Sequence, residues 1–383
     1  MFQSSTKVDA PQTKDTNRMA RVEKGNRMTV FKFASIVAIA GWISAAYASD
    51  MVIASVAPLS GPLAFNGVQN LEGSRACIDE ANAAGGVHGH KLRLVAVDDQ
   101  YKAQETVRLV RLVAERNKPI AFLNLIGSEN VSALLRERTL VNVRIPVVGV
   151  SPGADILRKP GSPWIFHVQA SDGAQLKRIV SHLATIGLTR IAVAYQDSPF
   201  GQDGLKTVES FAAEINVAVT GRIPIAQGLE DLKQVAGQLR RTEAQAYVMI
   251  VAPDTGTLFV RDVLSSGDTT PICGMSYISV QGAIEKAGLS AATGLALAQV
   301  TPNVQSSNTA LVRRFQAAMG KYSEVRAPGQ HHLMGYVSCQ VVLEGLRNSG
   351  PAPKPERFLS AMRRTKIDIG GYLSHPVRSY GRL

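Results

Sequence analysis

A glycine and a serine, Gly127 and Ser128, lie where an apolar run gives way to a helical pattern in LNLIGSENVSALL (residues 123–135). At such a helix start the first-turn N–H groups and the helix dipole favour an anion, and a serine hydroxyl can add a hydrogen bond. This turn could therefore hold a carboxylate, or Ser128 could only cap its own helix. Ser151 and Gly153 mark a second turn of the same type, in PVVGVSPGADIL (residues 146–157).

Two further stretches could carry chemistry. The loop PLSGPLAFNG (residues 58–67) separates an apolar run from a helical pattern predicted over residues 68–84. We expect this loop to form the rim of a solute cleft, with Asn66 near the ligand. No Lys follows Gly67 at the spacing of a triphosphate-binding loop, so that function is excluded. Asp98 and Asp99 end another apolar run. They could form a metal or acid/base pair, although such acids more often cap the helix that follows, here after Lys102.

No catalytic or metal-binding residues are predicted. The chain lacks the HExxH pattern, and no G-x-G-x-x-G follows the first predicted strand. His331 and His332 are adjacent, so on a helix they face different directions and make a poor metal pair. A serine hydrolase would need a base beside Ser128, and the sequence gives no reason for His167 or His182 to lie there. We therefore expect no enzyme activity and no cofactor.

The N-terminus is predicted to be an export signal. Residues 1–48 contain basic residues, an apolar run over about residues 33–43, and small residues at Ala46 and Ala48. This pattern is typical of a secretory signal peptide cut after Ala48, and the apolar run is short for a membrane anchor. Met28 could be the true start. Export implies a periplasmic location.

Composition and charge indicate a globular chain with a solvated surface. Of 383 residues, 45% are hydrophobic and 19% are charged. The first 48 residues hold 7 Lys/Arg and 3 Asp/Glu, so 35 basic and 27 acidic residues remain beyond them, a net charge of +8. These charges are scattered rather than clustered, which argues against nucleic acid as a partner. Cys77, Cys273 and Cys339 have no metal-site spacing. One pair could form a disulfide, or all three could be buried thiols.

Apolar runs alternate with amphipathic helical patterns from residue 50 onward, which predicts an α/β fold with parallel sheets covered on both faces. The expected strands are Val52–Ala57, Leu92–Asp98, Ile120–Ile126, Pro146–Val150, Ile191–Tyr195, Val217–Pro224, Ala246–Val251, Ile272–Met275 and Gly294–Val300. The alternation is interrupted near residues 165–175 and again at residues 299–310. We expect two similar lobes, with a ligand cleft between them at the carboxyl ends of the strands.

Several motifs, in this order, resemble one known family. They are PLSGP after the first strand, IDEANAAGGVHG (residues 78–89), the Asp98–Asp99 pair, and RIAVAYQDSPFGQDGL (residues 190–205). Together they resemble the leucine/isoleucine/valine-binding proteins, the periplasmic solute receptors of ABC transporters, over about residues 52–366. The resemblance implies the type I periplasmic binding protein fold, with two Rossmann-like lobes joined by a multi-strand hinge.

The resemblance also implies domain limits. After the leader (residues 1–48), residues 49–170 and 300–365 would form the first lobe, and residues 171–299 and 366–383 the second. The final segment stops short of the family's last strands, so a truncated C-terminus is a further interpretation. The family's disulfide near the first-lobe cleft has no matching cysteines here.

Ligand-binding positions follow from the same resemblance. The serine equivalent to Ser128, together with the loop of Ser151 and Gly153, would hold a ligand carboxylate. Phe200 would close over the ligand from the second lobe. The family's acid for a ligand ammonium is replaced by Ser276, followed by Tyr277. A buried ammonium without a carboxylate is costly, so this change favours an acid that lacks an amino group, unless Asp99 or Asp197 reaches the site.

The sequence therefore predicts a monomeric periplasmic binding protein. It would capture an amino acid or a related organic or aromatic acid and deliver this small-molecule solute to an ABC transporter permease. Closure of two lobes around a ligand is a known type of hinge motion. The alternatives are a solute sensor for a signalling partner and an exported α/β hydrolase.

Overall fold

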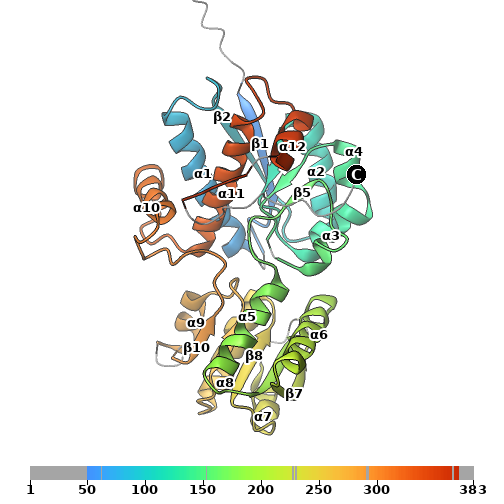
Figure 1. Cartoon of the computed structure of the whole chain (residues 1–383), viewed down its shortest axis with the longest axis vertical. Coiled ribbons are helices and arrows are strands. Elements are labelled where there is room, and N and C mark those ends of the chain that lie inside the picture. Colours follow the sequence, from blue (N-terminus) through green and yellow to red (C-terminus); the bar gives the residue numbers. More distant parts are fainter. Residues whose placement is uncertain are drawn as a thin grey trace, which may run out of the picture. The chain divides into compact units, whose positions relative to one another are not determined.

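The structure is a computed structural model of the whole chain (Figure 1). It describes residues 50–370, except residues 62, 152, 227, 229–230, 290–292 and 365. The predicted signal peptide and residues 371–383 therefore lie outside the described residues. The described chain contains two five-stranded sheets, and each sheet has its own hydrophobic core.

The first sheet has the strand order β2-β1-β3-β4-β5, and every pairing is parallel. Its strands are β1 (Met51–Ala57), β2 (Leu92–Asp98), β3 (Ala121–Leu123), β4 (Val147–Val148) and β5 (Ile165–Phe166). Most of their side chains are buried because helices cover a parallel sheet on both faces. This sheet and the helices on it form the first lobe.

The second sheet has the strand order β10-β9-β8-β6-β7 and is also parallel. Its strands are β6 (Arg190–Gln196), β7 (Ala218–Ile225), β8 (Ala246–Ile250), β9 (Ile272–Gly274) and β10 (Leu295–Leu297). All five residues of β8 are buried, as expected for the central strand. This sheet and its helices form the second lobe. The chain passes from the first lobe to the second between β5 and α5, and it returns between β10 and α10.

Helices alternate with the strands in both lobes. In the first lobe they are α1 (Ala64–Ala83), α2 (Ala103–Asn117), α3 (Ser128–Arg136), α4 (Thr139–Val143), the 3₁₀ turn η1 (Asp155–Leu157), α10 (Ala310–Tyr322), α11 (Gln330–Arg347) and α12 (Pro355–Arg364). In the second they are α5 (Asp172–Thr185), α6 (Pro199–Glu214), α7 (Lys233–Arg240), α8 (Pro253–Ser265) and α9 (Val280–Ala287). The α/β prediction is confirmed.

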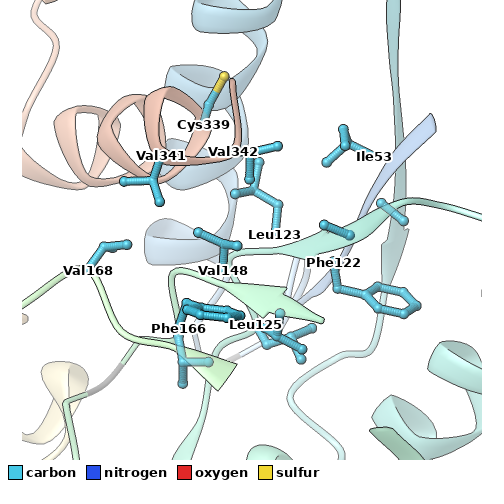
Figure 2. Close-up of a cluster of buried hydrophobic side chains, with 14 of the residues drawn as sticks. Ile53, Phe122, Leu123, Leu125, Val148, Phe166, Val168, Cys339, Val341 and Val342 are labelled. Atoms are coloured by element: carbon cyan, nitrogen blue, oxygen red, sulfur yellow. The ribbon is translucent and has the colours of Figure 1, made fainter. Parts of the chain in front are cut away.

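The core of the first lobe joins the sheet to helices from distant parts of the sequence. Figure 2 shows Phe122, Val148 and Phe166 of three neighbouring strands together with Val341 and Val342 of α11. All five side chains are at most 1% exposed. Burying a side chain of this size contributes roughly 1.5–3 kcal/mol, so this contact fixes the C-terminal helices on the first sheet.

A disulfide and a polar seam also hold α11 on α1. Cys77 of α1 is bonded to Cys339 of α11, across 262 residues of sequence. Near it, the Tyr336 hydroxyl donates to Glu80 Oε2 at 2.7 Å. The sequence left open whether one pair of cysteines forms a disulfide or all three are buried thiols, and the structure contains one disulfide. Cys273 remains a buried thiol, and burial raises its pKa to about 11.

Three details differ from the sequence predictions. The two-residue strand β5 was not expected, because IFHV (residues 165–168) interrupts the pattern instead of continuing it. Helix α1 begins at Ala64 rather than at residue 68, so Asn66 belongs to a helix and not to a loop. Ile367 and Ile369 pack in the core of the first lobe, whereas residues 366–383 were expected in the second.

Candidate functional site

A cavity of about 1310 Å³ is lined by residues of both lobes. The first lobe contributes the turns that follow β1, β2, β3 and β4. The second lobe contributes the start of α5 and the turns that follow β6, β8 and β9. These turns lie at the carboxyl ends of parallel strands, the usual place for a ligand in open α/β sheets. The expected cleft is therefore present.

Six of the eight predicted site residues line this cavity, and two do not. Those that line it are Asn66, Gly127, Ser128, Ser151, Phe200 and Tyr277. Gly153 is buried beside the first residues of α5, where an added Cβ would lie 2.5 Å from the Ala170 carbonyl oxygen. Ser276 is 4% exposed, and its main chain is bonded on both sides. Its N–H donates to Gln175 Oε1 at 3.0 Å, and its carbonyl accepts from Gln330 of the first lobe.

The start of α3 has one backbone N–H fewer available to a ligand than the sequence suggested. Gly127 is the N-cap, and its N–H donates to the Ser151 carbonyl at 2.8 Å, so it is not free for a ligand. Ser128 is the first helical residue rather than the cap. The first N–H groups of a helix, here those of Ser128 and Glu129, have no partner within the helix. An anion would therefore be bound by these amides and the Ser128 hydroxyl.

The ring of Tyr101 leaves no room for a side chain at Gly127. Its φ of +103° lies outside the range that other residues favour, and an added Cβ would be 2.6 Å from Tyr101 Cε2. Tyr101 lines the cavity beside Ser128. Burial, followed by the nearby Asp99 and Glu129 carboxylates, raises the pKa of Tyr101, so its hydroxyl is protonated and can donate. Sequence analysis missed Tyr101, although its position just after a strand end was the available signal.

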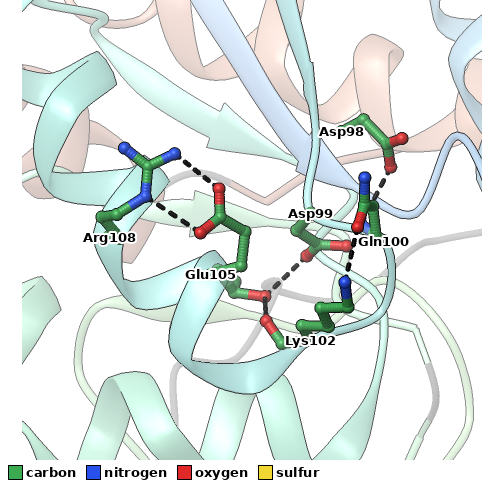
Figure 3. A network of polar contacts seen from close by, with 7 residues as sticks. Asp98, Asp99, Gln100, Lys102, Glu105 and Arg108 are labelled. Carbon is green, nitrogen blue, oxygen red and sulfur yellow. Dashed lines mark hydrogen bonds and ion pairs between the residues drawn. The ribbon is translucent and has the colours of Figure 1, made fainter.

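Asp98 and Asp99 stabilise the turn after β2 and do not cap α2. Figure 3 shows part of the network of polar contacts that these two acids form. Asp98 accepts from the N–H groups of Leu59 and Gln100 at 2.8 and 2.9 Å. Asp99 accepts from the Thr106 hydroxyl at 2.6 Å, and its burial raises its pKa. The cap of α2 is Lys102, without a side-chain hydrogen bond, so the capping prediction is wrong. Neither Asp99 nor Asp197 lines the cavity.

Asn66 is positioned by a histidine of α11. Its Nδ2 lies 2.9 Å from His331 Nε2. Burial, together with the neighbouring His332, lowers the pKa of His331 to about 4, so the neutral ring can accept this hydrogen bond at neutral pH. His332 instead contacts Glu72 through Nε2, at 3.0 Å. The two histidines thus have different partners, as expected for adjacent helical residues.

The second lobe contributes an aromatic pair. The rings of Phe200 and Tyr277 have their centroids 6.1 Å apart, with their planes inclined at 60°. Phe200 lies in the first turn of α6, directly after Pro199. Tyr277 is 9% exposed, and burial, followed by the charge of Asp172, raises its pKa well above the usual value. Both rings are neutral surfaces that face the cavity.

Asp172 is a cavity-lining acid that sequence analysis did not single out. It is the first residue of α5 and is 6% exposed. Its Oδ2 has no hydrogen-bond partner among the described residues, and its Oδ1 is 3.5 Å from Gln175 Nε2. Burial, followed by the charge of Asp155, raises the pKa of Asp172 to about 7. The available signal was ASDGAQ (residues 170–175), where an acid opens a helix just after the first chain crossing.

The serine at residue 151 does not form a hydrolase site. Gly149 to Gly153 has the G-x-S-x-G spacing of a nucleophile turn. However, Ser151 pairs with Ile126 in a parallel bridge rather than lying at a strand-to-helix turn. No histidine of the described residues lines the cavity; His167 and His182 both lie elsewhere. In the described part of the chain, no group of three His, Cys, Asp or Glu side chains could hold a metal ion.

Comparison with known proteins identifies the family. The model of the periplasmic binding protein family matches residues 51–380, so the chain belongs to that family, and it is of the leucine/isoleucine/valine-binding type. It is 25% identical to "Leu/Ile/Val-binding protein homolog 8" of Brucella abortus, over 87% of this chain and 85% of that one. The homologues and the fold are those of solute-binding proteins, not enzymes.

Solved structures agree with this assignment. A substrate-binding periplasmic protein from Ralstonia solanacearum is 30% identical, with a TM-score of 0.79, over 86% of this chain and 95% of that one. An extracellular ligand-binding receptor from Verminephrobacter eiseniae is 28% identical, with a TM-score of 0.81, over 87% and 95%. The prediction of a type I periplasmic binding protein fold is confirmed. Among the helices described, none has the length and apolarity to span a membrane.

Proposed function

We propose that this protein captures a small carboxylate-bearing solute in the cavity between its lobes and delivers it to the permease of an ABC importer. The observation that carries the proposal is the cavity itself, which combines a helix start of one lobe with an aromatic pair of the other. A solute that contacts both sides would favour a closed arrangement of the lobes, and that arrangement would be the form the permease recognises.

The carboxylate of the solute is assigned to the start of α3. Two first-turn amides and the Ser128 hydroxyl can donate to it, and the helix dipole adds a favourable field. Glu129 opposes an anion here, but its carboxylate is exposed and lies 3.4 Å from Arg136 of the same helix. Asn66 and Tyr101 would complete the first-lobe side of the site, while Gly153 and Ser276 would support the cavity from behind.

The apolar part of the solute is assigned to Phe200 and Tyr277. Aromatic side chains bury a large area and would cover the ligand from the second lobe. The name of the Brucella relative refers to branched-chain amino acids, and an apolar side chain fits this aromatic wall. We further propose export by the signal peptide within residues 1–48, action as a monomer in the periplasm, and no cofactor.

A thermal-shift screen of the purified chain tests the function. Amino acids, aromatic acids and dicarboxylates would be added one at a time at millimolar concentration. A solute present at about 100 times its dissociation constant stabilises the folded protein by about 2.7 kcal/mol and raises the melting temperature by several degrees. If no solute shifts melting, the proposed function is wrong. A solute sensor would bind equally well in this screen but would not support uptake in cells that express the permease.

A further inference from the structure

The solute cavity extends along α6, well beyond the aromatic pair. The residues of α6 that line it run from Phe200, in the first turn, to Ser210. At 1.5 Å per residue, this stretch of helix is about 15 Å long. The volume of about 1310 Å³ also exceeds the roughly 300–1,000 Å³ of most small-molecule sites. The cavity therefore has room for a solute longer than one that only joins the start of α3 to the aromatic pair.

Three segments of the chain meet in this extension. Asp155 Oδ2, in η1, accepts from the Gly173 N–H of α5 at 2.8 Å. A Cβ added to Gly173 would lie 3.5 Å from Thr207 Cγ2 of α6, so the first turn of α5 adjoins the middle of α6. The N–H of Lys159 donates to the Asp155 carbonyl at 3.0 Å, which holds the segment after η1 at the same place. All four residues line the cavity.

Each of these segments contributes one lysine to the cavity wall. Lys159 follows η1, Lys177 lies one turn beyond Gly173 on α5, and Lys206 lies on α6. All three are exposed, and none belongs to an ion pair within the described part of the chain. Lys177 Nζ instead lies 5.3 Å from the centroid of the Phe211 ring of α6. The extension thus contains three ammonium groups without a carboxylate partner.

The acids of the cavity do not cancel these charges. Asp155 and Asp203 line the same extension, and neither is in an ion pair with a lysine. Burial, followed by the charge of Asp155, raises the pKa of Asp172 to about 7, so this acid carries only part of a charge at neutral pH. Glu129 lies at the start of α3, beside Arg136. Three ammonium groups against two fully ionised carboxylates leave the extension net positive, which favours an anion.

An apolar surface adjoins the lysines. Ile156 lies three residues before Lys159, and its side chain is exposed although it lines the cavity. Covering such a side chain with an apolar part of the solute would remove its surface from water. Phe200 lies six residues before Lys206, which is about 9 Å along the axis of α6. An apolar chain of that length would contact the aromatic pair and end among the lysines.

We propose that the solute carries a second anionic group, a carboxylate or a phosphate, which binds among Lys159, Lys177 and Lys206. This inference rests on the proposed function and names the class of its ligand, an elongated acid charged at both ends. Its first carboxylate would lie at the start of α3, and its apolar middle would pass the aromatic pair. Lysine binds both carboxylate and phosphate as a point charge, so either group suits the second position.

The test uses matched probes that differ only in the second anionic group. Octanedioate is compared with octanoate, and decanedioate with decanoate, by isothermal titration of the full chain. Butanedioate and butanoate form a short pair, and 8-phosphonooctanoate distinguishes a phosphate-like group from a carboxylate. Each probe is titrated into the wild-type protein and into the double variant Lys177→Gln/Lys206→Gln.

The matched control variant is Lys321→Gln. Lys321 is also exposed, and its Nζ lies 5.1 Å from the centroid of the Tyr322 ring, but it does not line the cavity. Its substitution therefore removes a charge and a ring contact of the same kind as that of Lys177. Circular dichroism of the three proteins shows whether the variants are folded, as expected for changes at exposed lysines.

The wild-type protein is expected to bind at least one of the two long diacids at least about fivefold more tightly than the monoacid of the same length. Butanedioate is too short to reach the lysines and should gain less than about twofold over butanoate. The double variant should weaken the long diacid at least about fivefold and the monoacid less than about twofold, because exposed ion pairs are worth up to about fivefold each. Lys321→Gln should change neither.

Two results would overturn the inference: monoacids that bind as tightly as the long diacids, or a double variant that keeps the full preference for the diacid. Tighter binding of 8-phosphonooctanoate or of octanedioate would support it and identify the second group as a phosphate or a carboxylate. If no long diacid or phosphono acid binds while another carboxylate-bearing solute raises the melting temperature, the inference is wrong and the solute-binding function stands. If no carboxylate-bearing solute binds, both proposals are wrong.

Discussion

The starts of α3 and α5 are built alike and carry opposite chemistry. Each helix follows a strand of the first sheet, and each has a small capping residue, Gly127 or Ser171. In α3 the first helical residue is Ser128, which leaves a site of N–H and hydroxyl donors. In α5 it is Asp172, which places a carboxylate where the dipole should stabilise it, yet burial and Asp155 raise its pKa. The residue at the first helical position, together with its burial, thus makes one helix start a set of donors and the other a buried acid.

The largest effect is expected for Gly127→Ala, which would disrupt the α3 start and leave α5 unchanged. The new Cβ would collide with the Tyr101 ring, and the alanine would have to adopt an unfavourable positive φ. Backbone strain and overpacking together should lower the free energy of unfolding by about 4 kcal/mol. Urea denaturation would measure it.

The matched control for that substitution is Gly187→Ala. Gly187 also has a positive φ, of +84°, but an added Cβ would have no atom within 4 Å. Only the backbone strain remains, so the expected loss is about 1 kcal/mol. Equal losses in the two variants would show that the contact with Tyr101 does not matter.

An effect of similar size and opposite sign is expected for Asp172→Asn in the absence of solute. The folded-state pKa of about 7 exceeds the unfolded value of about 3.9. The unfolded chain therefore releases its proton first, and the wild-type protein loses stability as pH rises from about 4 to 7. Removing the charge should stabilise the protein by about 4 kcal/mol at pH 8 and hardly at all at pH 4.

Urea denaturation at the two pH values, with Asp203→Asn as the control, would measure this difference. Asp203 is exposed, so its substitution should have little effect at either pH. A destabilised Asp172→Asn at pH 8 would mean that the carboxylate has a partner in the folded protein. The comparison of the two helix starts would then lose its electrostatic basis.

The smallest effect is expected for Ser128→Ala. Loss of one hydroxyl donor should weaken a carboxylate ligand by about 1 kcal/mol, or roughly fivefold in dissociation constant. Ser132→Ala is the control, since Ser132 lines the same cavity one turn further along α3. Unchanged affinity in Ser128→Ala would show that the first-turn amides alone bind the anion.

Much of the fold could be predicted from the sequence, because continuous apolar strands and amphipathic helices have clear patterns. All nine expected strands exist, although β3, β4 and β10 are clearly shorter than expected. β5 has only two residues, and its pairing with β4 comes from the tertiary fold. The early start of α1 was missed because Ala64 to Gly67 follow the segment PLSGPL (residues 58–63), whose composition is typical of a loop.

The site was less predictable, for a physical reason. Ser128, the first residue of α3, and Phe200, in the first turn of α6, were predicted and line the cavity. Asp172 was missed because an acid at a helix start is usually a solvated cap, and only its burial in the fold, to 6% exposed, makes it unusual. The Cys77–Cys339 bond depends on the packing of α1 against α11, which no local pattern shows.

Titrations with matched probes test the carboxylate site at the start of α3 most directly. Three probes would be titrated into the wild-type protein, Ser128→Ala and Ser132→Ala: L-leucine, 4-methylpentanoate without the ammonium, and 3-methylbutylamine without the carboxylate, with the phenylalanine series in parallel. Ser128→Ala should weaken only the two compounds with a carboxylate, and Ser132→Ala should weaken none of them. If Ser128→Ala weakens the amine as much as the two carboxylates, the start of α3 does not bind the carboxylate of the solute.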